Sequence, residues 1–309
     1  MSVPSDTSGH GNRIAAGSVL EWIDKAGYAC AVGWAGTYAV TAYVGNVRYS
    51  RPVSVGSLAA VHARIIHTGR SSMHVLVSVE TSDVRERKYE PAADCILVFV
   101  AIDEHGAAVE VPQWQPRSDS DHALHSHALE RIPVRQEIKT AMAQQSYTDA
   151  GTTPQTILRF LAPPSSANWG GNAHGGTVMR WIDEAAYACA ASWSSTAAVA
   201  VYSGGIHFHR PIHIGDLVEV RARLIHTGPH SMHIAIHVHS ADPRTPDQLS
   251  LTTQCMSVFV VPGIDGRAEA VTQLELRTDE DRQLDAHARD LLERRERMLP
   301  IPSELAWRE

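Results

Sequence analysis

Two aspartates lie where a charged side chain is costly, within mostly apolar stretches of the chain. Asp24 follows Trp22-Ile23, and Asp183 follows Trp181-Ile182. A carboxylate buried among apolar residues needs hydrogen-bonding partners. Such a group can activate water or attack a carbonyl carbon directly. A hydrogen bond to the backbone, without any catalytic role, is the alternative at both positions, and the repetition favours catalysis.

A pair of glycines opens the apolar stretch that carries the second aspartate. In the segment Gly170-Gly-Asn-Ala-His-Gly-Gly, Gly175 and Gly176 stand at the predicted start of a long helix, directly after Asn172 and His174. The unpaired N–H groups of a helix N-terminus can hold a thioester oxygen as it gains negative charge, which makes an oxyanion hole. A tight loop against a sheet would need the same glycines. The residue types leave both interpretations open.

The distance between these two features predicts how a site would be assembled. Asp183 lies seven residues after Gly176, which is about 10 Å along a helix. It is therefore too far away to act on a carbonyl group bound at its own helix terminus. Two such helices running antiparallel would bring the start of one near the middle of the other. We therefore expect a catalytic site shared between two domains.

The chain contains two copies of one pattern, which supplies the second helix. Trp22 and Trp181 are 159 positions apart (181 − 22), and the same offset relates Asp24 to Asp183. The match continues without a gap over about sixty positions. A period of this length indicates two whole domains rather than a solenoid of short repeats.

Each copy predicts one long buried helix followed by an antiparallel meander of strands. Apolar residues at a spacing of three to four predict a helix over about 17–36, and Val- and Ile-rich stretches predict four strands. In the first copy these strands are expected at Tyr38–Ser50, Ser57–His67, Ser72–Thr81 and Ala93–Ile102. The second copy repeats this order from Gly176 to Val261 and adds a strand at Gln155–Phe160.

A sheet that wraps around one long helix is the hotdog arrangement, an α+β fold. We expect two tandem hotdog domains that pair about a pseudo-twofold axis, as two chains would in a homodimer. The predicted division is an N-terminal hotdog domain over 1–116, a linker over 117–153, a C-terminal hotdog domain over 154–276 and a helical tail over 277–309.

Composition narrows the range of partners. The formal net charge of −7 argues against a general nucleic-acid binder. The first ten residues lack a basic and an apolar signal region, and no apolar run has membrane-spanning length. We therefore expect a cytoplasmic protein without a membrane span.

The four cysteines lack Cys-x-x-Cys spacing, and the 18 histidines include strand pairs such as His207 and His209. Most strand histidines do not bind metal, so we expect no metal site.

The chain resembles the tandem-hotdog acyl-CoA thioesterases of the cytosolic and brain acyl-CoA hydrolase type. The resemblance covers both halves, and its most specific pieces are Asn172-Ala-His-Gly-Gly followed by Trp181-Ile-Asp-Glu, His67-Thr-Gly-Arg-Ser-Ser-Met and His226-Thr-Gly-Pro-His-Ser-Met. It implies hydrolysis of fatty acyl-CoA to free fatty acid and CoA, with no cofactor besides the CoA of the substrate. It also implies a homo-oligomer, such as a trimer of double hotdogs.

In this family an asparagine just before the helix acts with an aspartate inside the helix of the opposite domain. The resemblance therefore implies that Asn172 acts with Asp24. The reciprocal site would pair Asp183 with residues 11–17, where the sequence departs from the pattern: Asn12 is displaced by one position, and Ala15 and Ala16 replace His and Gly. We expect one active site per chain, built from Asn172, the Gly175-Gly176 terminus and Asp24.

Two turns, Thr68-Gly-Arg-Ser-Ser and Thr227-Gly-Pro-His-Ser, are expected to hold the CoA part of the substrate. Exposed N–H and hydroxyl groups bind anions well. From residue types alone, both would be ordinary β-turns. With the resemblance, the residues expected to bind substrate are His174, Gly175, Gly176, Thr68, Gly69, Arg70, Ser72, Thr227, Gly228 and Ser231.

Two other functions fit a hotdog scaffold. One is a non-catalytic acyl-CoA-binding protein. The other is a hydratase or dehydratase, which would need a histidine paired with a carboxylate near the helix. The Gly-Asp-x-Asn-Pro pattern typical of hydratases is absent, and Gly215-Asp216-Leu217 falls at a strand start instead. Thioester hydrolysis is the function that the sequence favours.

Overall fold

The computed structural model describes residues 3, 13–86, 88–298, 300–302 and 305. The chain divides into two compact units. The first unit comprises 1–131, 175–180 and 300–309, and the second comprises 132–174 and 181–299. The boundary at 131/132 falls inside α2 (Asp119–Gln144), and the boundary at 180/181 falls inside α3 (Gly175–Trp193). Neither unit is therefore a single continuous stretch of sequence.

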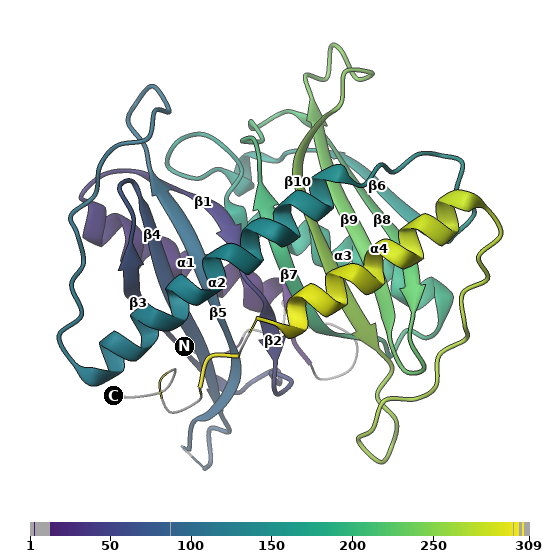
Figure 1. Ribbon diagram of the computed structural model, residues 1–309, viewed down its shortest axis with the longest axis horizontal. Coiled ribbons are helices and arrows are strands. Elements are labelled where there is room, and N and C mark those ends of the chain that lie inside the picture. Colours follow the sequence, from purple (N-terminus) through teal and green to yellow (C-terminus); the bar gives the residue numbers. More distant parts are fainter. Residues whose placement is uncertain (1–2, 4–12, 87, 299, 303–304, 306–309) are drawn as a thin grey trace. The chain divides into compact units, whose positions relative to one another are not determined.

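The first unit is an antiparallel sheet with a long helix against it (Figure 1). The sheet order is β3–β4–β5–β1, and the short β2 pairs with β5. Its elements are α1 (Ala16–Ala35), β1 (Ala39–Val44), β2 (Val47–Tyr49), β3 (Leu58–Thr68), β4 (Ser72–Ser82) and β5 (Glu90–Ala101).

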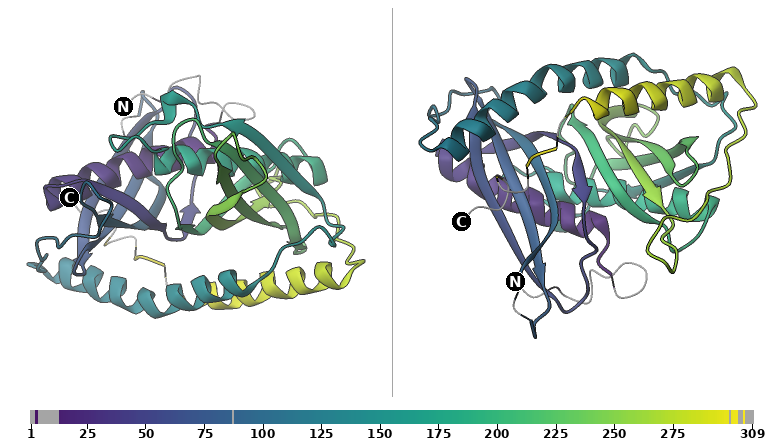
Figure 2. Two further views of the ribbon diagram at one scale, coloured as in Figure 1. Left: turned by 90° about the horizontal axis from the view of Figure 1, so that it is seen from above. Right: turned by 60° about the horizontal axis from the view of Figure 1, so that its bottom comes forward.

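Helices cover both faces of this sheet (Figure 2). α1 packs on one face, where Gly27 lets it approach closely, because a Cβ there would lie 2.9 Å from the ring of Phe99. On the other face, Leu124 and Ala128 of α2 pack in a buried cluster with Ile66, Leu76 and Ile96. Burial from both sides explains why residues 73–79 of β4 are buried without interruption instead of alternately.

The second unit repeats this plan. Its antiparallel sheet has the order β7–β10–β9–β8–β6. Its elements are β6 (Gln155–Leu161), the 3₁₀ turn η2 (Pro164–Ser166), most of α3, β7 (Val199–Phe208), β8 (Leu217–Thr227), β9 (Met232–Ala241), β10 (Ser250–Val260) and α4 (Asp279–Glu296).

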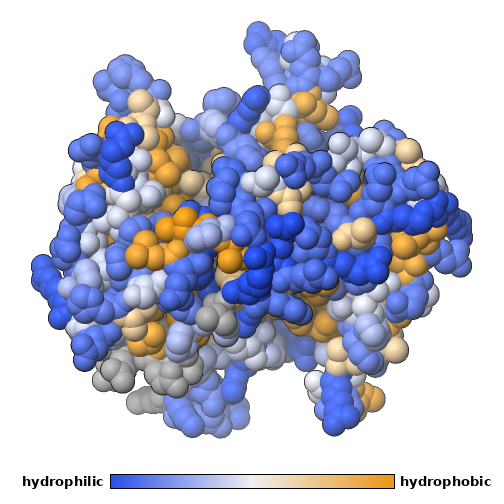
Figure 3. All heavy atoms as spheres, in the orientation of Figure 1, coloured by the Kyte–Doolittle hydropathy of each residue, from blue (hydrophilic) through white to orange (hydrophobic). Residues whose placement is uncertain are grey.

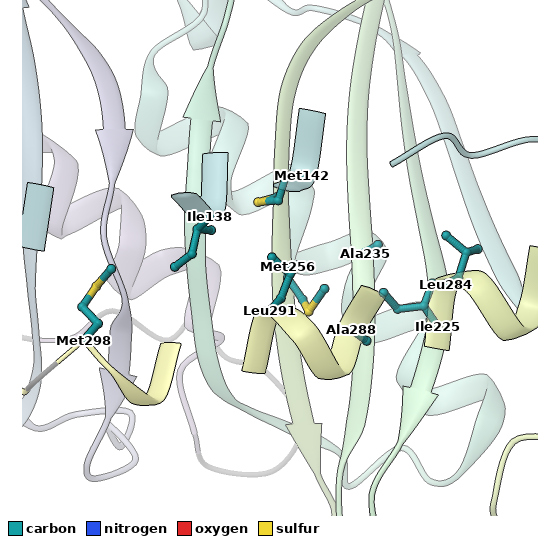
Figure 4. Close-up of a cluster of buried hydrophobic side chains, with 9 residues drawn as sticks. All are labelled: Ile138, Met142, Ile225, Ala235, Met256, Leu284, Ala288, Leu291 and Met298. Atoms are coloured by element: carbon teal, nitrogen blue, oxygen red, sulfur yellow. The ribbon is translucent and has the colours of Figure 1, made fainter. Parts of the chain in front are cut away.

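The helix α4 starts and packs as its sequence dictates. Thr278 and Asp281 form a capping box that satisfies the first backbone N–H groups. Leu284, Ala288 and Leu291 of α4 point toward the side chains of the sheet in a cluster that includes residues of α2 (Figure 4). The outer side of α4 carries charged pairs, and the surface there is mainly hydrophilic in Figure 3.

The helix and meander predicted for each half are present, as is the added strand before α3. One detail of the prediction was wrong: the expected strand Tyr38–Ser50 is broken into β1 and β2. The break lies at Gly45, whose N–H donates to the carbonyl of Ile96 and whose Cβ, if present, would lie 2.8 Å from that oxygen. None of the described helices has the length and apolar character needed to cross a membrane.

Candidate active site

The Asp24 carboxylate is fully buried and held at both oxygens. The hydroxyl of Thr41 donates to Oδ1 at 2.7 Å, and the backbone N–H of Gly176 donates to Oδ2 at 2.7 Å. All three residues belong to the first unit. The start of α3 therefore lies against the middle of α1, and the cost of burying this acid is offset by charge-assisted hydrogen bonds.

Each partner is placed by its own element. Thr41 lies on β1 opposite Phe99 of β5, whose ring packs under α1 at Gly27. Gly176 lies in the first turn of α3, where backbone N–H groups have no partner within the helix. A carboxylate at this position also benefits from the positive end of the helix dipole. The arrangement gives the Asp24 side chain a fixed orientation.

The glycine pair is required by this close approach. A Cβ on Gly175 would lie 3.0 Å from the hydroxyl oxygen of Thr41 and 3.2 Å from each carboxylate oxygen of Asp24. A Cβ on Gly176 would lie 2.9 Å from the Cα atom of Glu21 in α1. The glycines therefore permit the close packing that brings the terminus of α3 to the carboxylate. An oxyanion hole at this terminus stays a prediction.

The hydrogen bonds limit what this terminus can contribute to catalysis. The N–H of Gly176 is already given to Asp24, so in this structure it orients the carboxylate. An oxyanion would need another backbone N–H, and within the glycine pair that leaves Gly175. The assembly offers an oriented carboxylate, able to act on a water or on a carbonyl carbon, beside the positive end of a helix.

Thr41 was missed by the sequence analysis, although the repeat contains a signal for it. With the 159-residue offset, the position that matches Thr41 is Ala200. The two are structurally equivalent, because Thr41 pairs with Phe99 and Ala200 pairs with Phe259. The hydroxyl is present only in the copy that contains Asp24, the carboxylate to which it donates.

Asn172 and His174 lie in the loop before α3, in the second unit. The backbone N–H of Asn172 donates to the side-chain oxygen of Asn168 at 3.1 Å, and the N–H of His174 donates to the carbonyl of Ser166. Asn168 therefore shapes this loop, a positioning role that the sequence analysis also missed. The joint action of Asn172 with Asp24 stays a prediction.

Part of the expected reciprocal site lies outside the described residues. Asp183 is buried on α3, with 6% of its surface exposed. Gly11 and Asn12, which would face it in the expected pairing, lie outside the described residues. Ala15 precedes α1 without a side-chain hydrogen bond to the helix. The expectation that this site is impaired stays a prediction.

The two turns predicted to bind CoA are closed hairpins with the same internal bonds. The N–H of Gly69 donates to the carbonyl of Ser72, and that of Gly228 to the carbonyl of Ser231, each at 2.9 Å. The hydroxyls of Thr68 and Thr227 are mostly buried and accept from the backbone N–H groups of Trp114 and Leu274. These bonds account for the shape that the two turns share. Arg70 is exposed at its turn. Substrate binding by these residues stays a prediction.

Three strand histidines of the second unit, His207, His233 and His237, are uncharged at neutral pH. Burial is the main cause that lowers the pKa of His207, His233 and His237 to about 3 in each case. Within the described residues, no group of three or more His, Cys, Asp or Glu side chains is placed to hold a metal ion.

Comparison with known proteins matches both halves to one family. The thioesterase superfamily model matches residues 11–88 and 170–246. Mouse acyl-coenzyme A thioesterase 11 is 25% identical over 276 residues, which is 84% of this chain but only 46% of that protein. The human cytosolic acyl coenzyme A thioester hydrolase is 24% identical over 297 residues, covering 91% of this chain and 78% of that protein.

A solved structure shows the same fold over most of the chain. A candidate oleoyl thioesterase from Lactobacillus plantarum has a TM-score of 0.58 at 8% identity, covering 84% of this chain and 93% of that one. Together with the two family matches, this likeness confirms the predicted tandem hotdog α+β class.

Proposed function

Because the chain belongs to the thioesterase superfamily, we propose that it is an acyl-CoA thioesterase that hydrolyses fatty acyl-CoA to free fatty acid and CoA. Its relatives over most of its length are named as an acyl-coenzyme A thioesterase and an acyl coenzyme A thioester hydrolase. The observation that carries the proposal is the buried Asp24 carboxylate, held by Thr41 and by the N-terminus of α3. No cofactor is required, since CoA is part of the substrate.

The geometry supports hydrolysis by a carboxylate of fixed orientation. Acting as a general base, Asp24 takes a proton from water as the water oxygen bonds to the thioester carbonyl carbon. The carbon–sulfur bond then breaks, and the proton passes to the CoA sulfur. Direct attack by Asp24 on the carbonyl carbon is the other route, with water hydrolysing the resulting anhydride. Both routes require the carboxylate, and Asn172 is the residue we propose to act with it.

Thiol release from acyl-CoA tests this function. The free thiol of CoA is followed with dithionitrobenzoate over a series of acyl chain lengths. We expect release by the wild type and a loss of about 10³-fold in kcat for Asp24→Asn, which keeps the shape of the side chain but removes its basic oxygen. Glu130→Gln, at an exposed position on α2, is the matched control and should retain activity.

The two alternatives give different results in the same experiment. Saturable binding of acyl-CoA with no thiol release at any chain length would establish a non-catalytic binding protein. Loss of the conjugated enoyl-CoA absorbance without thiol release would establish a hydratase. Either result would sink the proposed hydrolase.

Association and location are further parts of the proposal. β6 is the edge strand of the second unit and exposes Ile157 and Leu161, of which 43% and 57% are accessible. Exposed apolar edge strands favour pairing with another chain, which supports a homo-oligomer, with three chains as the expected number. Sedimentation analysis of the wild type and of Leu161→Lys measures it, and a monomeric wild type would contradict it. A cytoplasmic location is favoured by the human relative, which is named cytosolic.

A further inference from the structure

A polar cavity lies in the second unit, on sheet residues outside the candidate active site. Its volume is about 520 Å³, within the range of small-molecule sites. Its floor is a row of neighbours across three strands, in which His237 of β9 pairs with Gln254 of β10 and with Arg221 of β8. The end of α2 and the segment that follows it, including Tyr147, form a wall.

Gln254 has an unused donor in this cavity. Only 3% of the residue is exposed, and its side-chain Nε2 has no hydrogen-bond partner among the described residues. Leaving a buried donor unsatisfied costs about 1–3 kcal/mol, so such groups are uncommon unless a ligand or water completes them. Nδ1 of His239, which also lines the cavity, has no partner in the described part of the chain either. The cavity therefore offers polar groups to a ligand that accepts hydrogen bonds.

The charges around the cavity favour an anion. Glu219 has 1% of its side chain exposed and is shared by Arg159 and Arg221. Arg223, with 8% exposed, lies 3.3 Å from Glu280. Of the residues that line the cavity, Arg221 and Arg223 carry guanidinium groups, and Glu219 carries a carboxylate. Asp149 lies 3.7 Å from Arg221 but is 85% exposed to solvent, which weakens its effect. The lining residues themselves thus carry about one net positive charge.

The other residues that line the cavity indicate which kind of ligand it could hold. Met142, Leu249 and Leu251 contribute apolar surface to the same cavity. A phosphate monoester carries about −1.5 to −2 charges at pH 7, more than the lining can compensate, whereas a carboxylate carries one. We propose that this cavity binds a small organic carboxylate, with its oxygens near Gln254 and Arg221 and its apolar part against the leucines.

The sequence of the first unit differs at two positions of this site. Asp94 stands at the position that matches Gln254, and Ser78 stands at the position that matches His237. Burial raises the pKa of the Asp94 carboxyl, which Arg48 and Arg131 oppose. A carboxyl group in place of the amide would not favour an anionic ligand. The site is therefore a property of one half of the chain, and it does not depend on the proposed hydrolase activity.

Isothermal titration calorimetry with sodium hexanoate tests the site on the full chain. We expect saturable binding by the wild type, at least about tenfold weaker binding by Gln254→Leu, and unchanged binding by Gln115→Leu, an exposed glutamine in the first unit. Inorganic phosphate should not bind in a saturable way. No binding of hexanoate by the wild type, or equal affinity in Gln254→Leu, would overturn the proposal.

A second variant keeps the test decisive if Gln254→Leu does not fold. Ala143→Phe adds a ring to an exposed position of the cavity wall without removing a hydrogen bond. It should retain the wild-type melting temperature and lose hexanoate binding. Wild-type affinity in this folded variant would place hexanoate elsewhere and overturn the proposal, as would saturable phosphate binding that competes with hexanoate.

Discussion

The helices α1 and α3 carry an aspartate at the same place, but the residues provided for the two acids differ. Asp24 has the hydroxyl of Thr41, whereas the position that matches Thr41 in the other copy is Ala200. The start of α3 has Gly175, whereas the start of α1 has Ala16. The duplication has kept both acids and changed what surrounds them. Retention of a residue in both copies is therefore weaker support for catalysis than retention of its partners.

The outer faces of the two sheets differ in a similar way. Arg64 and Arg223 occupy matched positions, but Arg64 donates to the carbonyl of Leu305, while Arg223 pairs with Glu280. In the first unit, Ile301 of the C-terminal segment adds to the buried cluster on that face. In the second unit, the polar cavity remains. One ancestral face has thus been covered by chain in one copy and left able to bind a ligand in the other.

The largest effect is expected from removing the two helix acids in turn. Asp24→Ala should lower kcat for thioester hydrolysis by about 10³-fold or more, because it removes the group that acts on the substrate. Asp183→Ala should stay within about threefold of the wild type if the reciprocal site is impaired. Thiol-release kinetics measure both, and the opposite ranking of the two variants would reverse the assignment.

The second-largest effect on kcat is expected from Gly175→Ala. The first copy has an alanine, Ala16, at the matched position. Gly175→Ala adds a Cβ 3.0 Å from the Thr41 hydroxyl and 3.2 Å from the Asp24 oxygens, so the terminus of α3 must shift. A displacement of this kind can lower kcat by about 10²-fold. Gly33→Ala in α1 is the control, because nothing lies within 4 Å of its added Cβ. Equal activity of both variants would show that the glycine pair serves packing alone.

A smaller effect on kcat is expected from replacing Thr41 by alanine, the residue at the matched position 200 of the second copy. Thr41→Ala removes one hydrogen bond to a charged group and should lower kcat by about tenfold. Thr41→Ser keeps the hydroxyl and should recover most of the activity, and the reciprocal Ala200→Thr should have no effect. Full activity of Thr41→Ala would mean that Gly176 alone orients the carboxylate.

The smallest effect concerns stability in acid. The folded state lowers the pKa of His237 to about 3, mainly by burial, whereas the unfolded value is near 6.5. Between these values the unfolded chain binds the extra proton, so stability is lost as the pH falls below about 6.5. His237→Ser, which imports the residue of the first copy, should lessen the loss between pH 7.5 and 5.5 by about 1 kcal/mol.

Urea unfolding at the two pH values measures this difference. His122→Ser, on the exposed side of α2, is a control that should leave the pH dependence unchanged. An unchanged pH dependence in His237→Ser would show that His237 takes up its proton equally in both states.

The sequence predicted the parts of this molecule that depend on local pattern. The repeat and its periodicity gave the helix and the meander of each half, and the cost of burying an acid singled out Asp24. Thr41 could not be predicted in that way, because a threonine in a strand is common and its role depends on a helix 17 residues away. The break at Gly45 depends on neighbouring strands in the same way, as does the side-chain Nε2 of Gln254, which has no partner among the described residues. Comparison of matched positions between the copies shows a difference at Thr41 and at Gln254, but not at Gly45, because the matched residue Gly204 is also a glycine.

The bond between Asp24 and Gly176 also has a consequence for the order of events during synthesis. The two residues are 152 positions apart. At a translation rate of about 5–20 residues per second, roughly 8 to 30 s pass between the synthesis of the acid and that of its backbone donor. Through that interval the first sheet and its helix can form, but the carboxylate at their centre lacks one of its partners. The N-terminal half therefore matures late, after the ribosome has begun the second helix.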